Sequence, residues 1–585
     1  MLKQLKYLTK RDWLFVFISC VFIFGDVWCE LTVPDYMSKI TTYITSGDGA
    51  MSKILENGAY MLMYAVGSVI CIVASKYFSS IVAASLGRNL RKQVFDKVVD
   101  FSDAEIKKFS TASLITRSTN DVVQIQNIVA MGLTVLVKAP MMAIMAIVKI
   151  VKTNIAWTLA TVIAVVFIVV VISIITIVAM PRFKKIQTYT DDLNRVTREG
   201  LTGVRVVRAF NAENYQENKF AKTNKDITDN HLFISKVMSL MDPAMTIIMN
   251  GLPLSIYAIG AILISKAGML ERISTFSSMI TFSQYAIQVV MAFVMLIMIF
   301  IMLPRAQVSA RRVNEVLETK NSIVDGDGKY QPIKEGEVQF VNVGFKYPDA
   351  EEYVLHDISF KAEKGQTIAF IGSTGSGKST LINLVPRLYD ATEGQVIVDG
   401  VNVKDYTIEQ LNNKIGYISQ KAVLFSGTVK SNVTLGEKEN KKPTDEDVSN
   451  ALEIAQAHFV SKLPDRVDSR IDQGGKNVSG GQKQRLSIAR ALARNPEILI
   501  FDDSFSALDY KTDKMLREAL NDKASHITRL IVAQRIGTIK NADKIIVLDQ
   551  GRVVGEGTHS QLMKNCSVYK EIALSQLSKE ELKNA

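Results

Sequence analysis

Apolar residues are unevenly distributed along this 585-residue chain, because most of its long apolar runs end before about residue 304. A helix needs roughly 20 apolar residues to cross the hydrocarbon core of a bilayer. Six runs approach or exceed that length, and we predict that each forms a membrane span: 13–31, 59–86, 133–151, 155–180, 241–265 and 276–303. The remainder has the mixed pattern of a soluble domain, with strand-like sequence from about residue 337.

The polar connections between these runs differ in charge. Lys and Arg are abundant in the N-terminal lead, residues 1–12, and in two connections, 88–108 and 182–236. The other connections are shorter or more balanced in charge. The positive-inside rule therefore predicts that both termini and the two basic connections lie in the cytoplasm.

The two basic connections, about 87–132 and 181–240, are long, polar and compatible with helix. Structureless connections of that length are uncommon in compact proteins, although two flexible loops remain the alternative. We therefore predict that the membrane helices project into the cytoplasm in pairs, each closed by a short turn.

Charge, the N-terminal residues and the cysteines add three limits. The formal net charge is +11, but many Lys and Arg residues flank apolar segments, which favours anionic lipid headgroups over a nucleic-acid partner. The basic N-terminus precedes an apolar run that continues past Asp26 without a small-residue cleavage site, so we predict no cleaved signal peptide.

The four cysteines have neither metal-site nor disulfide spacing: Cys20, Cys29, Cys71 and Cys566.

A phosphate-binding loop follows a short apolar strand at 367–371 and leads into a helix. Its glycines let backbone N–H groups surround phosphate oxygens, and the helix N-terminus favours negative charge. Lys378 is expected to reach the β- and γ-phosphates and Ser379 to bind Mg²⁺. The predicted ATP-binding residues of this loop are Gly372, Ser373, Thr374, Gly375, Ser376, Gly377, Lys378, Ser379 and Thr380.

A second apolar strand, residues 498–501, ends in Asp502 and Asp503. An acid at this place in a P-loop protein holds Mg²⁺ directly or through water, and we assign that role to Asp502. The alternative, an acid that only closes a turn, is weakened by the presence of the phosphate-binding loop.

With these motifs, residues 336–565 resemble the ATPase domain of ABC transporters. Val478 and the residues after it are similar to the LSGGQ signature, which in that family caps the γ-phosphate of ATP held by the opposite subunit: Ser479, Gly480, Gly481 and Gln482. Tyr347 matches the aromatic residue that stacks on adenine, and Asp509 lies in the match to the D-loop. Gln420 matches the glutamine that contacts Mg²⁺ or water and couples to the membrane domain.

The resemblance extends to the exporters whose membrane domain precedes the ATPase. It implies an all-α transmembrane domain of six helices (type IV exporter), residues 13–320, a linker at 321–335, and an α/β P-loop ATPase domain at 336–585. It also implies coupling helices, for which we assign residues 103–113 and 200–210, and an exchange of the fourth and fifth spans with a partner subunit.

Three positions depart from the family pattern. Asp503 stands where the family usually has the Glu that polarises the attacking water, and its carboxylate would lie about 1.5 Å further from that water, a displacement that can cost on the order of 100-fold in rate. Gln534 replaces the switch histidine. Its amide can donate one hydrogen bond to the γ-phosphate, but it cannot take up a proton or carry a positive charge. Gln473 replaces a Glu in the loop before the signature, which puts normal coupling in doubt.

These departures beside an otherwise complete binding apparatus predict slow hydrolysis at this chain's own site. The pattern resembles the degenerate-site subunit of bacterial heterodimeric multidrug exporters, so we predict a second half-transporter as partner and a place in the bacterial cytoplasmic membrane. A homodimer remains the alternative. The predicted substrate is an amphipathic small molecule, with a lipid or lipopeptide as second hypothesis and a regulatory subunit that transports nothing as third.

The sequence indicates less about the translocation path than about the nucleotide site. Asp26 and Glu30 are four residues apart and share a helical face inside the first span. Charges at membrane depth usually line a cavity or pair with one another, although these two could also lie at headgroup level. We predict a substrate path at Asp26, Glu30, Gln284 and Gln288.

Overall fold

The structure is a computed structural model that describes residues 2–46, 51–151, 153–330, 332–438 and 441–576. The chain divides into two compact units, Met1–Val99 with Ala112–Thr319, and Asp100–Thr111 with Lys320–Ala585. The sequence-based division placed Asp100–Thr111 in the membrane domain. Its contacts group it instead with the second unit, since Ala104 packs against the apolar core there.

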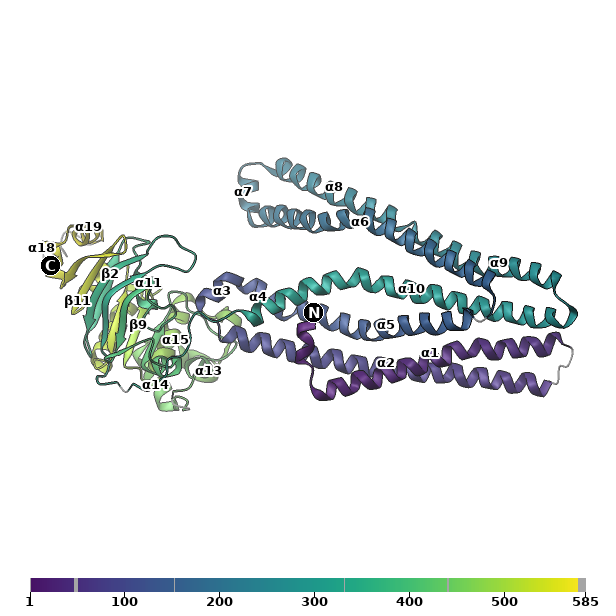
Figure 1. The fold of residues 1–585 in the computed structure, drawn as a ribbon. Helices are drawn as coiled ribbons and strands as arrows, with labels where there is room; N and C mark the ends of the chain where they lie inside the picture. Colours follow the sequence, from purple (N-terminus) through teal and green to yellow (C-terminus); the bar gives the residue numbers. More distant parts are fainter. Residues whose placement is uncertain (1, 47–50, 152, 331, 439–440, 577–585) are drawn as a thin grey trace. The chain divides into compact units, whose positions relative to one another are not determined.

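Long helices make up the first unit (Figure 1). Among the residues that the structure describes, six helical stretches are long and apolar enough to cross a membrane, and each overlaps one of the six predicted spans. The elements are η1 (Leu2–Tyr7), α1 (Lys10–Thr45), α2 (Met51–Val99), α4 (Thr111–Ser118), α5 (Asn120–Val151), α6 (Ile155–Thr202), α7 (Val204–Ala209), α8 (Glu213–Met238), α9 (Met241–Lys266) and α10 (Met269–Glu318).

These helices extend well beyond the apolar runs, as the polar helix-compatible connections predicted. In α1 the helix begins in the lead, where Thr9 and Asp12 form a capping box that satisfies backbone N–H groups. The extensions of α2 and α6 continue to Val99 and Thr202. A helix that leaves the bilayer keeps its internal hydrogen bonds, so hydropathy does not determine where it ends.

An apolar core joins α1, α5, α6, α9 and α10, and it includes Trp157 and Phe282, whose ring centroids are 5.3 Å apart. Much apolar surface remains exposed on α6, where Ile155 and Ile177 are 89% and 72% exposed. In Figure 1, α6, α7 and α8 diverge from the group formed by α1, α2, α5 and α10. Such surface is typical of a helix that faces lipid or another subunit.

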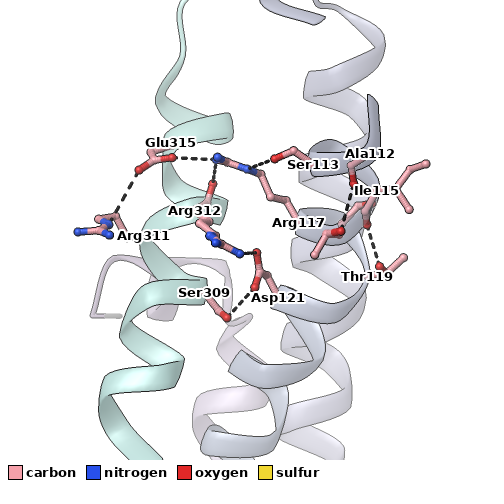
Figure 2. A network of polar contacts seen from close by, with 12 residues as sticks. Ala112, Ser113, Ile115, Arg117, Thr119, Asp121, Ser309, Arg311, Arg312 and Glu315 are labelled. Atoms are coloured by element: carbon pink, nitrogen blue, oxygen red, sulfur yellow. Dashed lines mark hydrogen bonds and ion pairs between the residues drawn. The ribbon is translucent and has the colours of Figure 1, made fainter. Parts of the chain in front are cut away.

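Polar contacts join α10 near its end to α4 and to the start of α5 (Figure 2). Arg117 donates to Glu315 Oε2 at 2.9 Å and to the carbonyl oxygen of Arg312 at 2.7 Å. Ser309 donates to Asp121 at 2.7 Å. These contacts fix the end of α10 against the helix that continues from the Asp100–Thr111 segment.

The second unit is an α/β domain with two main sheets. One has the order β2-β1-β4-β5 and is antiparallel. The other has the order β12-β11-β3-β10-β9-β6, parallel except for β12. The strands are β1 (Val338–Phe345), β2 (Leu355–Ala362), β3 (Thr367–Gly372), β4 (Glu393–Val398), β5 (Val401–Asn402), β6 (Ile415–Ile418), β7 (Gly427–Thr428), β8 (Arg470–Ile471), β9 (Ile498–Asp502), β10 (Thr528–Val532), β11 (Lys544–Asp549) and β12 (Arg552–Gly557).

Helices cover the six-stranded sheet, whose central strands β3, β9 and β10 are buried along almost their whole length. Continuous apolar strands are what a parallel sheet covered on both faces requires. The helices of this unit are α3 (Asp103–Phe109), α11 (Lys378–Asn383), α12 (Ile408–Lys414), α13 (Val429–Val433), α14 (Asp445–Ile454), η2 (His458–Lys462), η3 (Arg466–Asp468), η4 (Gln473–Gly475), α15 (Gly480–Leu492), α16 (Tyr510–Lys523), α17 (Ile536–Ile539), α18 (His559–Asn565) and α19 (Ser567–Gln576).

Candidate nucleotide-binding site

The parallel strands bring the predicted site residues to one edge of the sheet. Val532 at the end of β10 pairs with Phe370 of β3 on one side and with Asp502 of β9 on the other. Ile418, the last residue of β6, pairs with Phe501. Because ligands of open α/β sheets bind at the carboxyl ends of the strands, this edge is the candidate site.

The phosphate-binding loop connects β3 to α11 in the predicted strand–loop–helix order. Gly375 and Gly377 have φ values of +87° and +92°, which only glycine adopts without strain, and a Cβ on Gly377 would lie 2.7 Å from Leu355. Lys378 Nζ donates to the carbonyl oxygens of Gly372 and Ser373 at 3.0 and 2.6 Å. The ammonium therefore lies over the loop that would surround the phosphates.

Hard oxygen atoms lie where a divalent cation is expected. Ser379 Oγ donates to Asp502 Oδ1 at 2.6 Å, so a hydroxyl and a carboxylate are adjacent. Mg²⁺ prefers oxygen ligands and is usually held by one or two protein groups together with nucleotide phosphates. Ser379 and Asp502 fit Mg²⁺–ATP, with the ion neutralising phosphate charge when bound.

Asp503 receives two amide hydrogen bonds. Gln534 Nε2 donates to Asp503 Oδ2 at 2.8 Å, and Gln420 Nε2 donates to the same oxygen at 3.2 Å. The backbone of Asp503 has φ +48°, a left-handed conformation in which Asp is enriched among non-glycine residues. The structure thus brings together the three predicted catalytic residues.

Burial alters the acid–base properties of this edge. Desolvation raises the pKa of Asp502 and of Asp503 above that of an ordinary aspartate, since it disfavours the charged form. Desolvation lowers the pKa of Lys378 for the same reason. A divalent cation would oppose the shift of the two carboxyls, because it stabilises their ionised forms.

The residues that match the signature lie at the N-terminus of α15 and do not follow one of the strands of the six-stranded sheet. Ser479 caps this helix by accepting from the backbone N–H of Gln482, whose side chain accepts in return from the backbone N–H of Ser479. Ser479 and Gly480 are exposed. Asp509 caps α16 in the same way, accepting from Thr512. The exposed helix N-terminus offers N–H groups to an anion.

Tyr347 is half-buried beside the phosphate-binding loop, and its hydroxyl lies 2.9 Å from Thr380 Oγ1. Its ring packs edge-on against Tyr389, with centroids 5.2 Å apart. Sequence reasoning missed the residue next to these rings, Lys107 of α3, whose Nζ donates to the Tyr389 hydroxyl at 2.8 Å. Its only sequence signal was its place in a predicted coupling helix.

The predicted substrate-path residues are divided by the structure. Asp26 and Glu30 of α1 lie together, and both contact Lys138 of α5, with Nζ–O distances of 2.8 and 3.0 Å. Ser68 donates to Asp26 at 2.6 Å. The helical pattern did not identify Lys138 as the partner, although a lysine inside an apolar span was a usable signal.

Gln284 and Gln288 of α10 do not join this cluster in any described contact. Gln284 is exposed and Gln288 is half-buried, while Tyr285 between them donates to Asp35 at 2.6 Å. Their neighbours on α10, Phe282 and Val289, belong to the apolar core.

The chain is similar to known proteins over nearly its whole length. The ABC transporter transmembrane region family model matches residues 16–293, and the ABC transporter family model matches residues 355–506. An uncharacterised ABC transporter ATP-binding protein of Mycobacterium tuberculosis (strain H37Rv) is 40% identical over 91% of this chain and 90% of the relative. Another from Bacillus subtilis (strain 168) is 32% identical over 99% of both.

An ATP-dependent lipid A-core flippase of Pseudomonas putida is 30% identical over 94% of this chain and 92% of the flippase. Among solved structures, a bacterial Atm1-family ABC exporter with ATP bound matches 96% of this chain and 98% of that chain, with a TM-score of 0.78 and 24% identity. The similarity to this solved structure establishes the fold.

Proposed function

Because this chain belongs to the ABC transporters and combines the membrane and ATPase domains of a half-exporter, we propose that it is the slow-hydrolysing subunit of a heterodimeric multidrug exporter. It would export amphipathic small molecules across a bacterial cytoplasmic membrane, with both termini in the cytoplasm. ATP-driven transport is common to the family, whereas the division of labour between two subunits is the proposal.

The arrangement around Asp503 carries this proposal. The short carboxylate is held by the amides of Gln420 and Gln534, and neither amide can accept a proton from an attacking water. The phosphate-binding loop and the Ser379–Asp502 pair keep the form needed to bind Mg²⁺–ATP. Binding without rapid hydrolysis is what this combination supports.

The signature and α7 support a partner subunit. Ser479 and Gly480 expose a helix N-terminus that fits a phosphate held by another subunit. The second coupling-helix candidate, α7, contains no buried residue, and Phe210 beside it is 78% exposed. An exposed aromatic residue on a short helix is suited to docking. The partner would be a second half-exporter, and a homodimer is the alternative.

A lipid or lipopeptide flippase is the second candidate function. The similarity to a lipid A-core flippase of Pseudomonas putida favours it, since that relative matches membrane and ATPase domains together. ATPase stimulation by amphipathic drugs and by lipids in nanodiscs would distinguish these two substrate classes.

The proposed heterodimer leads to a specific expectation for the purified chain. We expect this chain alone to bind ATP but to hydrolyse it about 100-fold more slowly than the complex with its partner, because Asp503 and Gln534 supply no well-placed base. Phosphate release in nanodiscs, measured with and without the partner subunit, tests this. Rapid hydrolysis by the chain alone would contradict the proposal.

The cluster of Asp26, Glu30 and Lys138 is the proposed substrate contact in the membrane domain. Two carboxylates and one ammonium leave one excess negative charge, and charge at membrane depth is costly unless a partner compensates for it. Asp26 is held by Ser68 and Lys138, whereas Glu30 contacts only the shared lysine among the described residues. Glu30 is therefore the group suited to a cationic substrate.

Neutralising this charge should affect cations selectively. We expect Glu30→Gln to weaken export of monocationic dyes about tenfold and to leave neutral amphiphiles unchanged, since Asp26 and Lys138 remain a balanced pair. The matched control is Glu56→Gln, which removes an exposed carboxylate from α2. Efflux assays in vesicles measure both substrates. An equal effect on cations and neutral compounds would count against the contact.

A further inference from the structure

The segment between α2 and α4 contributes two charged residues beside the proposed adenine-stacking tyrosine. Lys107 Nζ lies 5.4 Å from the centroid of the Tyr347 ring and 5.3 Å from that of Tyr389. The same ammonium contacts Asp103 Oδ2 at 2.7 Å. The ring that would stack on a base therefore lies close to an ammonium, and that ammonium is paired with a carboxylate.

These side chains are held in place from several directions. The Tyr389 hydroxyl donates to Asp103 and accepts from Lys107, which closes a ring of three polar groups. Ala104 packs against the apolar core of the second unit, and Glu105 accepts from the backbone N–H of Ser322 at 3.0 Å. Because these contacts of α3 lie within the second unit, that unit determines the positions of Asp103 and Lys107.

Unused hydrogen-bonding capacity remains in this pair. A lysine ammonium has three N–H groups, and the described contacts of Lys107 use two of them. All described contacts of Asp103 go to Oδ2, which leaves Oδ1 as an acceptor. The Lys107 side chain is 62% exposed and that of Asp103 is 39% exposed. A ligand can therefore reach both groups.

We propose that Asp103 and Lys107 bind the edge of the purine stacked on Tyr347 and so determine the base specificity of this nucleotide site. Adenine presents an amino donor next to a ring-nitrogen acceptor, whereas guanine presents an acceptor and a donor in the opposite order. For a purine stacked on Tyr347 in one orientation, a carboxylate and an ammonium in fixed positions distinguish the two orders. In the orientation that we propose, Asp103 accepts from the adenine amino group and Lys107 donates to the ring nitrogen. The inference rests on the nucleotide site proposed above and adds its selectivity.

The test compares ATP and GTP binding to the full-length chain in nanodiscs with Mg²⁺, by titration calorimetry. We expect Lys107→Gln and Asp103→Asn each to reduce the ATP-over-GTP affinity ratio about tenfold, the effect of losing one charge-assisted hydrogen bond. Lys107→Arg should retain most of the preference, because it keeps the donor. Lys108→Gln is the matched control, since Lys108 is exposed on the same helix and contacts Phe109.

The outcomes separate this inference from the proposed function. Equal weakening of ATP and GTP in the Lys107 and Asp103 variants would assign the pair a purely structural role and overturn the inference. Variants whose affinities for ATP and GTP are both unchanged would overturn the inference as well. In either case, ATP binding by the wild-type chain would leave the proposed nucleotide site intact. A wild-type chain that binds neither nucleotide would overturn the site and the inference together.

Discussion

The double variant Asp503→Glu with Gln534→His should hydrolyse ATP about 100-fold faster than the wild-type chain. The longer carboxylate would approach the attacking water, and a histidine can carry the proton and positive charge that an amide cannot. In the present arrangement both amides donate to Asp503, so the carboxylate is engaged within the protein. Phosphate release by the purified chain in nanodiscs measures the change.

The two single variants and a third variant are the controls. Each single substitution should give a smaller gain, because base placement and phosphate contact are both required. Adding Lys378→Ala to the double variant should abolish the gain, since the ammonium lies over the phosphate loop. The Asp503→Glu substitution places a glutamate on a left-handed backbone, at a cost of about 1–2 kcal/mol in stability. An unchanged rate with intact ATP binding would refute the explanation of slow hydrolysis.

Gly481→Ala should reduce ATP turnover of the complex with the partner subunit about 100-fold. A Cβ at this position would meet Ala507 O at 3.4 Å and Leu508 Cδ2 at 4.0 Å, ordinary contact distances, so the domain itself tolerates the methyl group. The added methyl group would lie beside the N–H groups at the N-terminus of α15, between them and residues 507–508. Loss of one preorganised backbone donor to a reacting phosphate costs on the order of 100-fold in rate.

The location of the defect distinguishes the proposal from a general loss of function. ATP binding to this chain's own phosphate loop should persist in Gly481→Ala, because α15 would serve the partner's nucleotide. Gly58→Ala on α2 is the matched control, since a Cβ there meets no atom within 4 Å. Full turnover by the Gly481→Ala complex would show that this signature serves no working site.

Much of the architecture followed from local pattern. Six apolar runs predicted six membrane-spanning helices, because a bilayer sets a minimum apolar length that a sequence either meets or does not. The predicted order of strand, glycine-rich loop and helix around Lys378 and Ser379 is present in the structure for a similar reason, since a phosphate-binding loop is a local structure.

The meeting of Gln420, Asp503 and Gln534 could be expected only from the family resemblance. These residues follow three different strands, and the register between β6, β9 and β10 brings them together. Their hydrogen bonds then depend on side-chain geometry at a strand edge, where Asp503 adopts a left-handed backbone. Residue type alone does not predict that conformation.

By itself the sequence determined the number of spans, the phosphate-binding motif and the order of the two domains, since each depends on residues close together along the chain. Only the tertiary structure paired Asp26 and Glu30 with Lys138, and Tyr347 and Tyr389 with Lys107. These partners are more than one hundred residues apart in every pair, as in the 112-residue separation of Asp26 and Lys138. Ion pairs and ring contacts act over a few ångströms, so they form only where folding brings distant segments together.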